Sequence, residues 1–176
     1  MRKYTNRPPH LYLKETYYFI TDRTRDSKSY FNSNKKKNTL SRVLQKACKK
    51  FEVKIFAWVI LDNHYHLLIK LKKGKNLSKF IGKLHRDSAR LINILDGSPG
   101  RSIWWNYWDH CIRNEKDFWT HFNYIHHNPV KHSYVNEMKD WQFSSFNYYL
   151  RKYGEEWIAS CFEKYPIIDF TIERDK

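Results

Sequence analysis

The chain has 176 residues, which favours one domain and is long enough to bury an apolar core without disulfides or a structural metal. Its 33 lysines and arginines outnumber its 18 aspartates and glutamates, which gives a net charge of +15. A hydrophobic content of 41% excludes a disordered chain, and five glycines and five prolines exclude low-complexity sequence. Aromatic residues make up 18% of the chain. Positive charge combined with aromatic rings favours a nucleic-acid partner over a merely basic protein, because cations pair with phosphates while unpaired bases stack on rings.

Three further features bear on the compartment. Cys48, Cys111 and Cys161 are widely spaced and form no C-x-x-C pair, which argues against a disulfide framework or a zinc ribbon and fits a reducing environment. The basic residues 1–10 are followed by no apolar stretch of the kind found in signal peptides. No apolar run approaches the roughly 20 residues that span a bilayer. We therefore expect a cytoplasmic protein with no membrane partner.

Hydrophobic spacing and turn residues divide the first half of the chain into regular elements. In chain order they predict a basic arm over 1–13, a strand over 15–21, a polar loop over 24–37, a helix over 38–51, a strand over 53–61, a turn at Asp62 and Asn63, and a strand over 64–71.

The second half continues with an amphipathic helix over 77–95, a strand over 103–112, a helix over 115–127, irregular chain over 130–141, a short helix over 143–153 and a weakly periodic tail over 154–176. Asn114 is the expected N-cap of the helix over 115–127. Asn128 is expected to end that helix, because the residue before a proline avoids helical geometry.

The order β-α-β-β-α-β followed by helices predicts an α+β, ferredoxin-like fold, in which an antiparallel sheet is backed by two helices. The helix after the last strand is then an addition to this unit at its C-terminal side. We expect three parts: a basic arm over 1–13, one domain over 14–150 and a C-terminal tail over 151–176.

His64 and His66 are the first candidate site. Side chains two positions apart on a strand point to the same face, so the two imidazoles should project together just after a tight turn, while Tyr65 faces the core with the residues at positions 67, 69 and 71. Such a pair can hold one divalent metal ion. The alternative is two ordinary surface histidines.

The helix over 115–127 presents the second candidate site. Phe118, Phe122 and Ile125 form its buried stripe. Tyr124 and Asn128 lie four residues apart beside that stripe, so a phenol and an amide are presented together near the helix end. The alternative for Tyr124 is a boundary tyrosine whose ring packs while its hydroxyl remains in water.

Neither a Walker A sequence nor a G-x-G-x-x-G sequence is present, so use of nucleotide energy is not indicated. Without a nucleotide as energy source, any joining of nucleic-acid strands must conserve the energy of the broken bond in a covalent intermediate. A phosphotyrosine link does so, because one phosphodiester is exchanged for another of similar energy.

Four segments occur in an order that resembles a known family: DNHYHLL (62–68), WDHCIRN (108–114), YIHHNPVK (124–131) and DWQFSS (140–145). The chain resembles the single-tyrosine, histidine-hydrophobic-histidine transposases, and most closely the REP-associated tyrosine transposases, over about residues 17–146. The resemblance implies a ferredoxin-like fold whose added helix bears the nucleophile Tyr124. It also implies that His64, His66 and Asn128 bind a divalent metal, Mg²⁺ or Mn²⁺.

The implied activity is cleavage and rejoining of single-stranded DNA at hairpins through a 5′-phosphotyrosine intermediate, by a chain more similar to monomeric than to dimeric relatives. One alternative is a domesticated protein that binds hairpins without cutting them. Another is a metal nuclease that uses water and needs no tyrosine.

A further set of residues is expected to contact DNA phosphates: Arg2, Lys3, Lys79, Lys83, Arg86, Arg90 and Lys131. For the cations of the helix over 77–95 the alternative is a solvated helix face. Four further histidines, at 110, 121, 126 and 127, could assist proton transfer but are expected to contact DNA or to pack instead. Alternation predicts that either Trp104 or Trp105 points outward and is available to a base.

Overall fold

A computed structural model describes residues 16–168 and residue 170. Its elements in chain order are β1 (Tyr17–Arg23), η1 (Arg25–Ser27), α1 (Asn34–Phe51), β2 (Val53–Ile60), β3 (His64–Leu71), η2 (Gly74–Asn76), α2 (Leu77–Leu95), β4 (Trp108–Cys111), α3 (Glu115–Lys131), η3 (Met138–Asp140), α4 (Phe146–Tyr153) and α5 (Glu155–Lys164). The basic arm expected over 1–13, with Arg2 and Lys3, lies outside the described residues.

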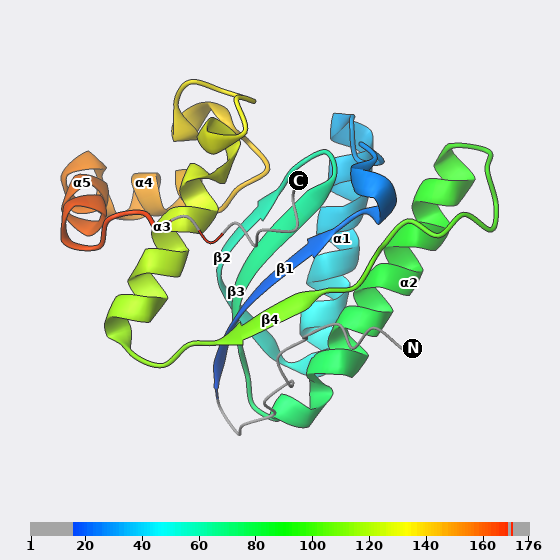
Figure 1. The fold of residues 1–176 in the computed structure, drawn as a ribbon, viewed down its shortest axis with the longest axis horizontal. Coiled ribbons are helices and arrows are strands. Elements are labelled where there is room, and N and C mark those ends of the chain that lie inside the picture. Colours follow the sequence, from blue (N-terminus) through cyan, green and yellow to red (C-terminus); the bar gives the residue numbers. More distant parts are fainter. Residues whose placement is uncertain (1–15, 169, 171–176) are drawn as a thin grey trace, which may run out of the picture.

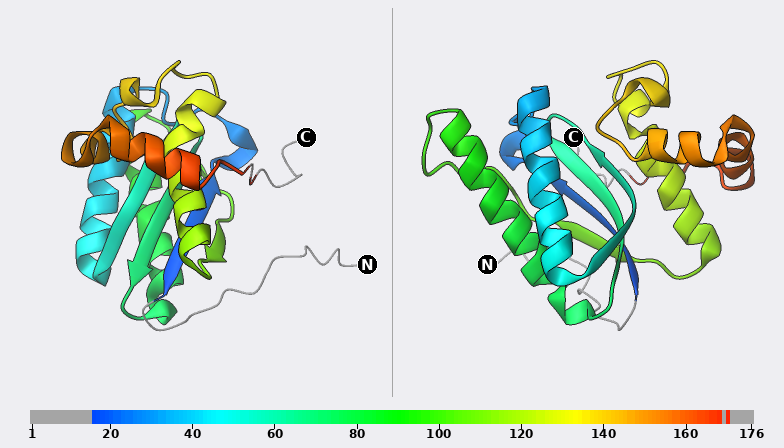
Figure 2. Two further views of the ribbon diagram at one scale, coloured as in Figure 1. Left: turned by 90° about the vertical axis from the view of Figure 1, so that its left-hand side faces the viewer. Right: turned by 180° about the vertical axis from the view of Figure 1, so that it is seen from behind.

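The strands form one antiparallel sheet in the order β2-β3-β1-β4. Helices α1 and α2 cover one face, and α3 lies on the other face with α4 and α5 beyond it (Figures 1 and 2). This arrangement confirms the ferredoxin-like fold with an added C-terminal helix. An α-helix follows β1 and another follows β3, as the split β-α-β pattern requires.

Alternation along β3 divides its side chains between two cores. Tyr65, Leu67 and Ile69 pack with α1 and α2 in the larger core, as predicted. Leu68 packs on the opposite face with Phe122 and Ile125 of α3. The same alternation places His64 and His66 on the α3 face, because side chains two apart share a face.

Helix α1 begins at Asn34, earlier than the predicted residue 38, so the loop predicted over 24–37 was wrong at its end. Ser33 is the N-cap and accepts a hydrogen bond from the Lys36 amide. The lysines at 35–37 are good helix formers and extend the helix to this cap. Lys37 is buried and lies 2.6 Å from the Asp62 carboxylate, which ties the start of α1 to the turn before β3.

The strand predicted over 103–112 was too long, since β4 covers Trp108–Cys111 only. Upstream, a single bridge joins Trp104 to Thr24. The Trp104 ring is buried and donates its indole hydrogen to Ser88 of α2 at 2.9 Å. Between this bridge and Trp108 the chain forms no regular strand, although the Trp105 amide still donates to the Arg23 carbonyl, and Trp105 is exposed.

Helix α3 was predicted to end at residue 127, but it continues through Pro129 to Lys131. A proline within a helix removes one hydrogen bond, yet the His132 amide still bonds to the Asn128 carbonyl at 3.1 Å and the turn is kept. Asn128 therefore remains in helical register with Tyr124. Helix α5, in the segment where weak periodicity predicted no element, is held to α3 by packing of Trp157 against Trp119.

Candidate active site

The position of α3 across the sheet is set by its cap and its apolar side. The Asn114 side chain accepts a hydrogen bond from the Asp117 amide at 2.9 Å and fixes the first turn. Phe122 and Ile125 are buried against Phe19 and Leu68 on the sheet. This packing aligns the C-terminal half of α3 with the start of β3, where His64 and His66 lie.

The structure brings the four predicted site residues together. The rings of His64 and His66 lie with their centroids 5.1 Å apart, and the His66 and Tyr124 centroids are 5.3 Å apart. His64 Nε2 lies 2.9 Å from Asn128 Oδ1. The interpretation of the two histidines as ordinary surface residues is excluded for His66, which is only 5% exposed.

Several buried nitrogens of this cluster have no hydrogen-bond partner in the described part of the chain. Neither ring nitrogen of His66 nor the side-chain nitrogen of Asn128 has a hydrogen-bond partner among the described residues. Leaving such atoms unsatisfied is costly unless a ligand, water or ion completes them. Burial, followed by the positive charges of His64, His132 and Lys131, holds the pKa of His66 well below its usual value. The ring is therefore neutral near pH 7 and keeps a lone pair for a metal.

Two neighbours of His64 were not found from the sequence. Asn63 Oδ1 lies 2.7 Å from His64 Nδ1, so both ring nitrogens of His64 face an amide oxygen, although a neutral imidazole can donate a hydrogen bond to only one of them. The His132 ring centroid lies 4.9 Å from that of His64. His132 follows Asn128 by four residues, and this spacing was the available signal.

Tyr124 is buried rather than at a boundary, with 6% of its surface exposed. Its ring packs with Phe19, His66 and Phe170. Lys131 Nζ lies 5.2 Å from its ring centroid, so this predicted DNA-contacting cation is beside the phenol.

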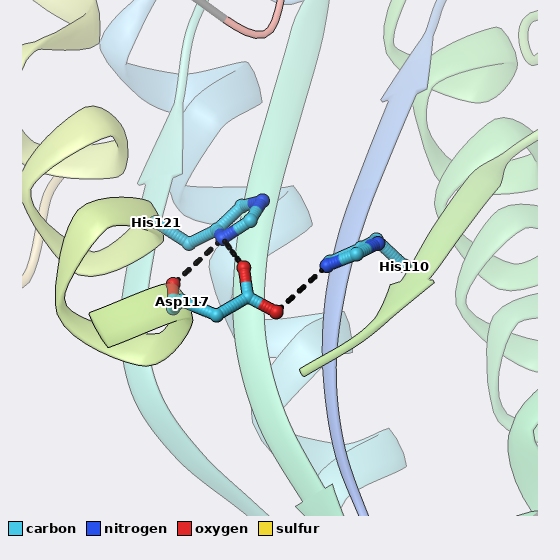
Figure 3. A group of neighbouring side chains, drawn as sticks. All are labelled: His110, Asp117 and His121. Atoms are coloured by element: carbon cyan, nitrogen blue, oxygen red, sulfur yellow. Dashed lines mark hydrogen bonds and ion pairs between the residues drawn. The ribbon is translucent and has the colours of Figure 1, made fainter. Parts of the chain in front are cut away.

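A second polar cluster joins β4 to α3 (Figure 3). Asp117 Oδ2 lies 2.9 Å from His110 Nε2, and Asp117 Oδ1 lies 2.9 Å from His121 Nδ1. The three possible ligand atoms lie within 4.8 Å of one another, so the group has the composition and spacing to hold a metal ion. The sequence predicts His110 and His121 only as separate DNA-contacting or packing residues, and the spacing of four between Asp117 and His121 is the signal that could have joined them.

Hydrogen bonds keep Asp117 ionised. Burial alone would raise the pKa of Asp117, but the Arg113 amide and the His110 ring lower it below its usual value. Burial lowers the pKa of His121, and Asp117 opposes that shift. Phe19 contacts both His121 and His66 and separates this cluster from the histidine pair of β3.

The other predicted residues divide between the two faces of the sheet. Lys79, Lys83, Arg86 and Arg90 lie on α2, away from the face that carries Tyr124, and Lys83 pairs with Asp87. His126 is a packing residue, as expected, since it is buried beside Ser145 and burial lowers its pKa to about 3. Trp104 points inward and Trp105 outward, as alternation predicted. Among the described helices, none combines the length and the apolar character needed to cross a membrane.

Comparisons with known proteins identify the family of the chain. The family described as "Transposase IS200 like" matches residues 12–128. A relative from Haemophilus influenzae, classed with the REP-associated tyrosine transposases, is 30% identical over 159 residues, covering 83% of this chain and 89% of the relative. The REP-associated tyrosine transposase of Escherichia coli is 30% identical over 139 residues, covering 77% of this chain and 79% of the relative.

A solved REP-associated tyrosine transposase bound to a REP hairpin superimposes with a TM-score of 0.72 at 27% identity, covering 84% of this chain and 87% of the other. The family match, the sequence relatives and the fold therefore agree. The chain belongs to the IS200-like transposase family and, within it, to the REP-associated tyrosine transposases.

Proposed function

We propose that the chain is a single-stranded DNA endonuclease and strand-transferase that acts at hairpins through a 5′-phosphotyrosine intermediate. The observation that carries this proposal is the convergence of Tyr124 from α3 with His64 and His66 from β3 and with Asn128, one turn further along α3. A phenol, two imidazoles, an amide and an adjacent cation thus lie close together, which supports the assignment of a nucleophile beside a metal-ligand set.

In the proposed reaction the Tyr124 oxygen attacks the scissile phosphorus in line with the departing 3′-oxygen. The P–O bond to tyrosine forms as the P–O bond to the 3′-oxygen breaks, the phenol proton is lost, and the 3′-oxygen leaves as a hydroxyl. Strand transfer reverses this exchange with another 3′-hydroxyl, so no nucleotide is consumed. Lys131, beside the phenol ring, would stabilise negative charge as the proton leaves.

His64, His66 and Asn128 would hold the divalent metal, and the unpartnered nitrogens of His66 fit that role. Two imidazoles and one amide form a neutral donor set that suits Mn²⁺ at least as well as the oxygen-preferring Mg²⁺. When bound, such an ion polarises a phosphate oxygen and offsets its charge. All of the proposed site residues come from one chain, which supports action as a monomer.

The decisive experiment compares native protein with Tyr124→Phe. Each is incubated with a labelled REP-type hairpin, which carries single-stranded flanks, in the presence of Mn²⁺ or Mg²⁺, and then analysed on a denaturing gel. Removing the phenol oxygen should abolish both cleavage and the denaturation-resistant protein–DNA adduct while hairpin binding persists. Tyr148→Phe, at a 52% exposed tyrosine of α4, is the matched control and should behave as native protein.

The same experiment separates the alternatives. A nuclease that uses water would still cleave with Phe at position 124. A domesticated hairpin-binding protein would bind but show neither cleavage nor adduct even with Tyr124 present. Either result would disprove the proposed mechanism.

A further inference from the structure

Trp105 is an exposed tryptophan in the segment that leads from α2 to β4. The residue is 58% exposed, although burial of a large aromatic ring stabilises a folded protein. The Arg25 guanidinium carbon lies 5.2 Å from the centroid of its ring. An aromatic ring in water with a cation over it is the combination that binds unpaired bases in single-stranded nucleic acids.

Backbone pairing places Trp105 on the same face of the sheet as the histidine pair. The Trp105 amide donates to the Arg23 carbonyl at 3.1 Å, and Arg23 is directly opposite His64 in the β1–β3 register. His64, Arg23 and Trp105 thus form a row across adjacent strands. Two strand spacings correspond to about 10 Å between the backbones of His64 and Trp105.

The direction of the Trp105 side chain follows from its neighbour. Trp104 points into the core beneath α2, where its ring stacks on His85 and its indole nitrogen bonds to Ser88. Consecutive side chains of extended chain point to opposite faces. Trp105 therefore faces the side of the sheet that carries His64.

The turn that supplies Arg25 is held in place next to the same site. The Thr24 amide donates to the Asn63 carbonyl at 2.8 Å, and the Asn63 side-chain nitrogen donates to the Ser27 carbonyl at 3.1 Å. Asp26 and Ser27 adopt positive φ angles of 56° and 53°, which are unfavourable for residues other than glycine. Asn63 contacts His64 as well, so one residue links this turn to the histidine pair.

We propose that Trp105 and Arg25 form a stacking platform for an unpaired base of the single-stranded segment that flanks the DNA hairpin. The platform would hold a nucleotide near the phosphate that reacts with Tyr124. This inference rests on the proposed function, since it assigns the platform to the same DNA substrate.

The test is a set of affinities measured at one salt concentration. The probes are a REP-type hairpin with a single-stranded 5′ extension, the same stem with a 3′ extension, and the same stem with none. Trp105→Ala should weaken binding to at least one extended hairpin by about 5- to 150-fold, the range that corresponds to the loss of one stacked base. Binding to the hairpin without an extension should not change.

Three further variants act as controls and as independent tests. Trp105→Phe keeps an aromatic face and should retain most of the affinity. Arg25→Ala leaves the ring in place and should weaken binding to the same extended hairpin by about 2- to 5-fold. Tyr148→Ala removes an exposed ring of α4 and should leave all three affinities unchanged.

Native affinities of Trp105→Ala and Arg25→Ala for every probe would overturn the platform. Equal losses on the extended and unextended hairpins would also overturn it, because the ring would then act on the stem or the fold. Failure of the proposed function gives a different pattern, in which native protein forms no adduct with any probe whatever the effect of Trp105.

Discussion

At the scale of single residues, the buried ring nitrogens of His66 that lack partners among the described residues support the proposed metal site. The pleat of β3 directs His64 and His66 to one face, and the helical spacing of four directs Tyr124 and Asn128 to the same point. Burial keeps His66 neutral and therefore able to bind a metal without first losing a proton.

We expect His66→Ala to abolish metal-dependent cleavage while leaving hairpin binding largely intact, because the loss of one imidazole opens the proposed ligand set. His64→Ala should do the same. His127→Ala is the control for loss of an imidazole from α3 outside the proposed ligands, and its hairpin affinity is measured with its cleavage rate because His127 is predicted to contact DNA or to pack. Cleavage rates are measured on the labelled hairpin over a range of Mn²⁺ concentrations, and native rates for both ligand variants at limiting metal would refute this assignment.

These residues differ in how far the sequence predicts them. Strand alternation and helix spacing are local rules, so the shared face of the histidines and the pairing of Tyr124 with Asn128 could be predicted. The contact of Asn63 with His64 could not, because it depends on how the turn between β2 and β3 closes. The burial of Tyr124 likewise depends on packing between α3 and the sheet.

At the scale of elements, features set by local sequence are again predictable, and features set by packing are not. The sequence predicts β3 and α2 with their observed bounds, because each has a strong period and clear turn signals. The predicted end of α3 is wrong, because hydrogen bonds and packing override the non-helical preference of the residue before Pro129. The predicted extent of β4 is also wrong, because burial of Trp104 beneath α2 interrupts the ladder.

The contact between β4 and α3 depends on Asp117, and we expect Asp117→Asn to lower the free energy of unfolding by about 1–3 kcal/mol at pH 7. The pKa of Asp117 lies below its usual value in the folded state, so its contribution is complete above about pH 4 and is lost as the pH falls below that. Urea unfolding of native protein and variant should therefore differ more at pH 7 than at pH 3.

The matched control for this prediction is Asp87→Asn, because Asp87 pairs with Lys83 along the surface of α2. Such pairs contribute little, and this variant should lose less than 1 kcal/mol, on the order of an exposed ion pair. Equal losses for the two variants would show that Asp117 is no more important than a surface charge.

At the scale of the whole molecule, the chain has a net charge of +15, and the described cations predicted to contact DNA lie on both α2 and α3. The proposed site lies on the α3 face, whereas Lys79, Lys83, Arg86 and Arg90 lie on α2 across the sheet. A hairpin bound at Tyr124 must extend around an edge of the sheet if these four cations are to reach its phosphates. The salt dependence of binding can decide whether it does.

The logarithm of affinity should fall with the logarithm of salt concentration by about 0.7 for each phosphate neutralised on single-stranded DNA. If the α2 cations contact phosphates as predicted, replacing all four by alanine should make this slope shallower by up to about 3. Replacing Arg42, Lys46, Lys49 and Lys50, which are exposed on α1, removes the same charge and is the control. A slope changed only by the α2 variant would place α2 in the DNA footprint. Equal slopes for the two variants would instead make these cations a solvated face, and a slope near zero for native protein would remove the electrostatic basis for DNA binding.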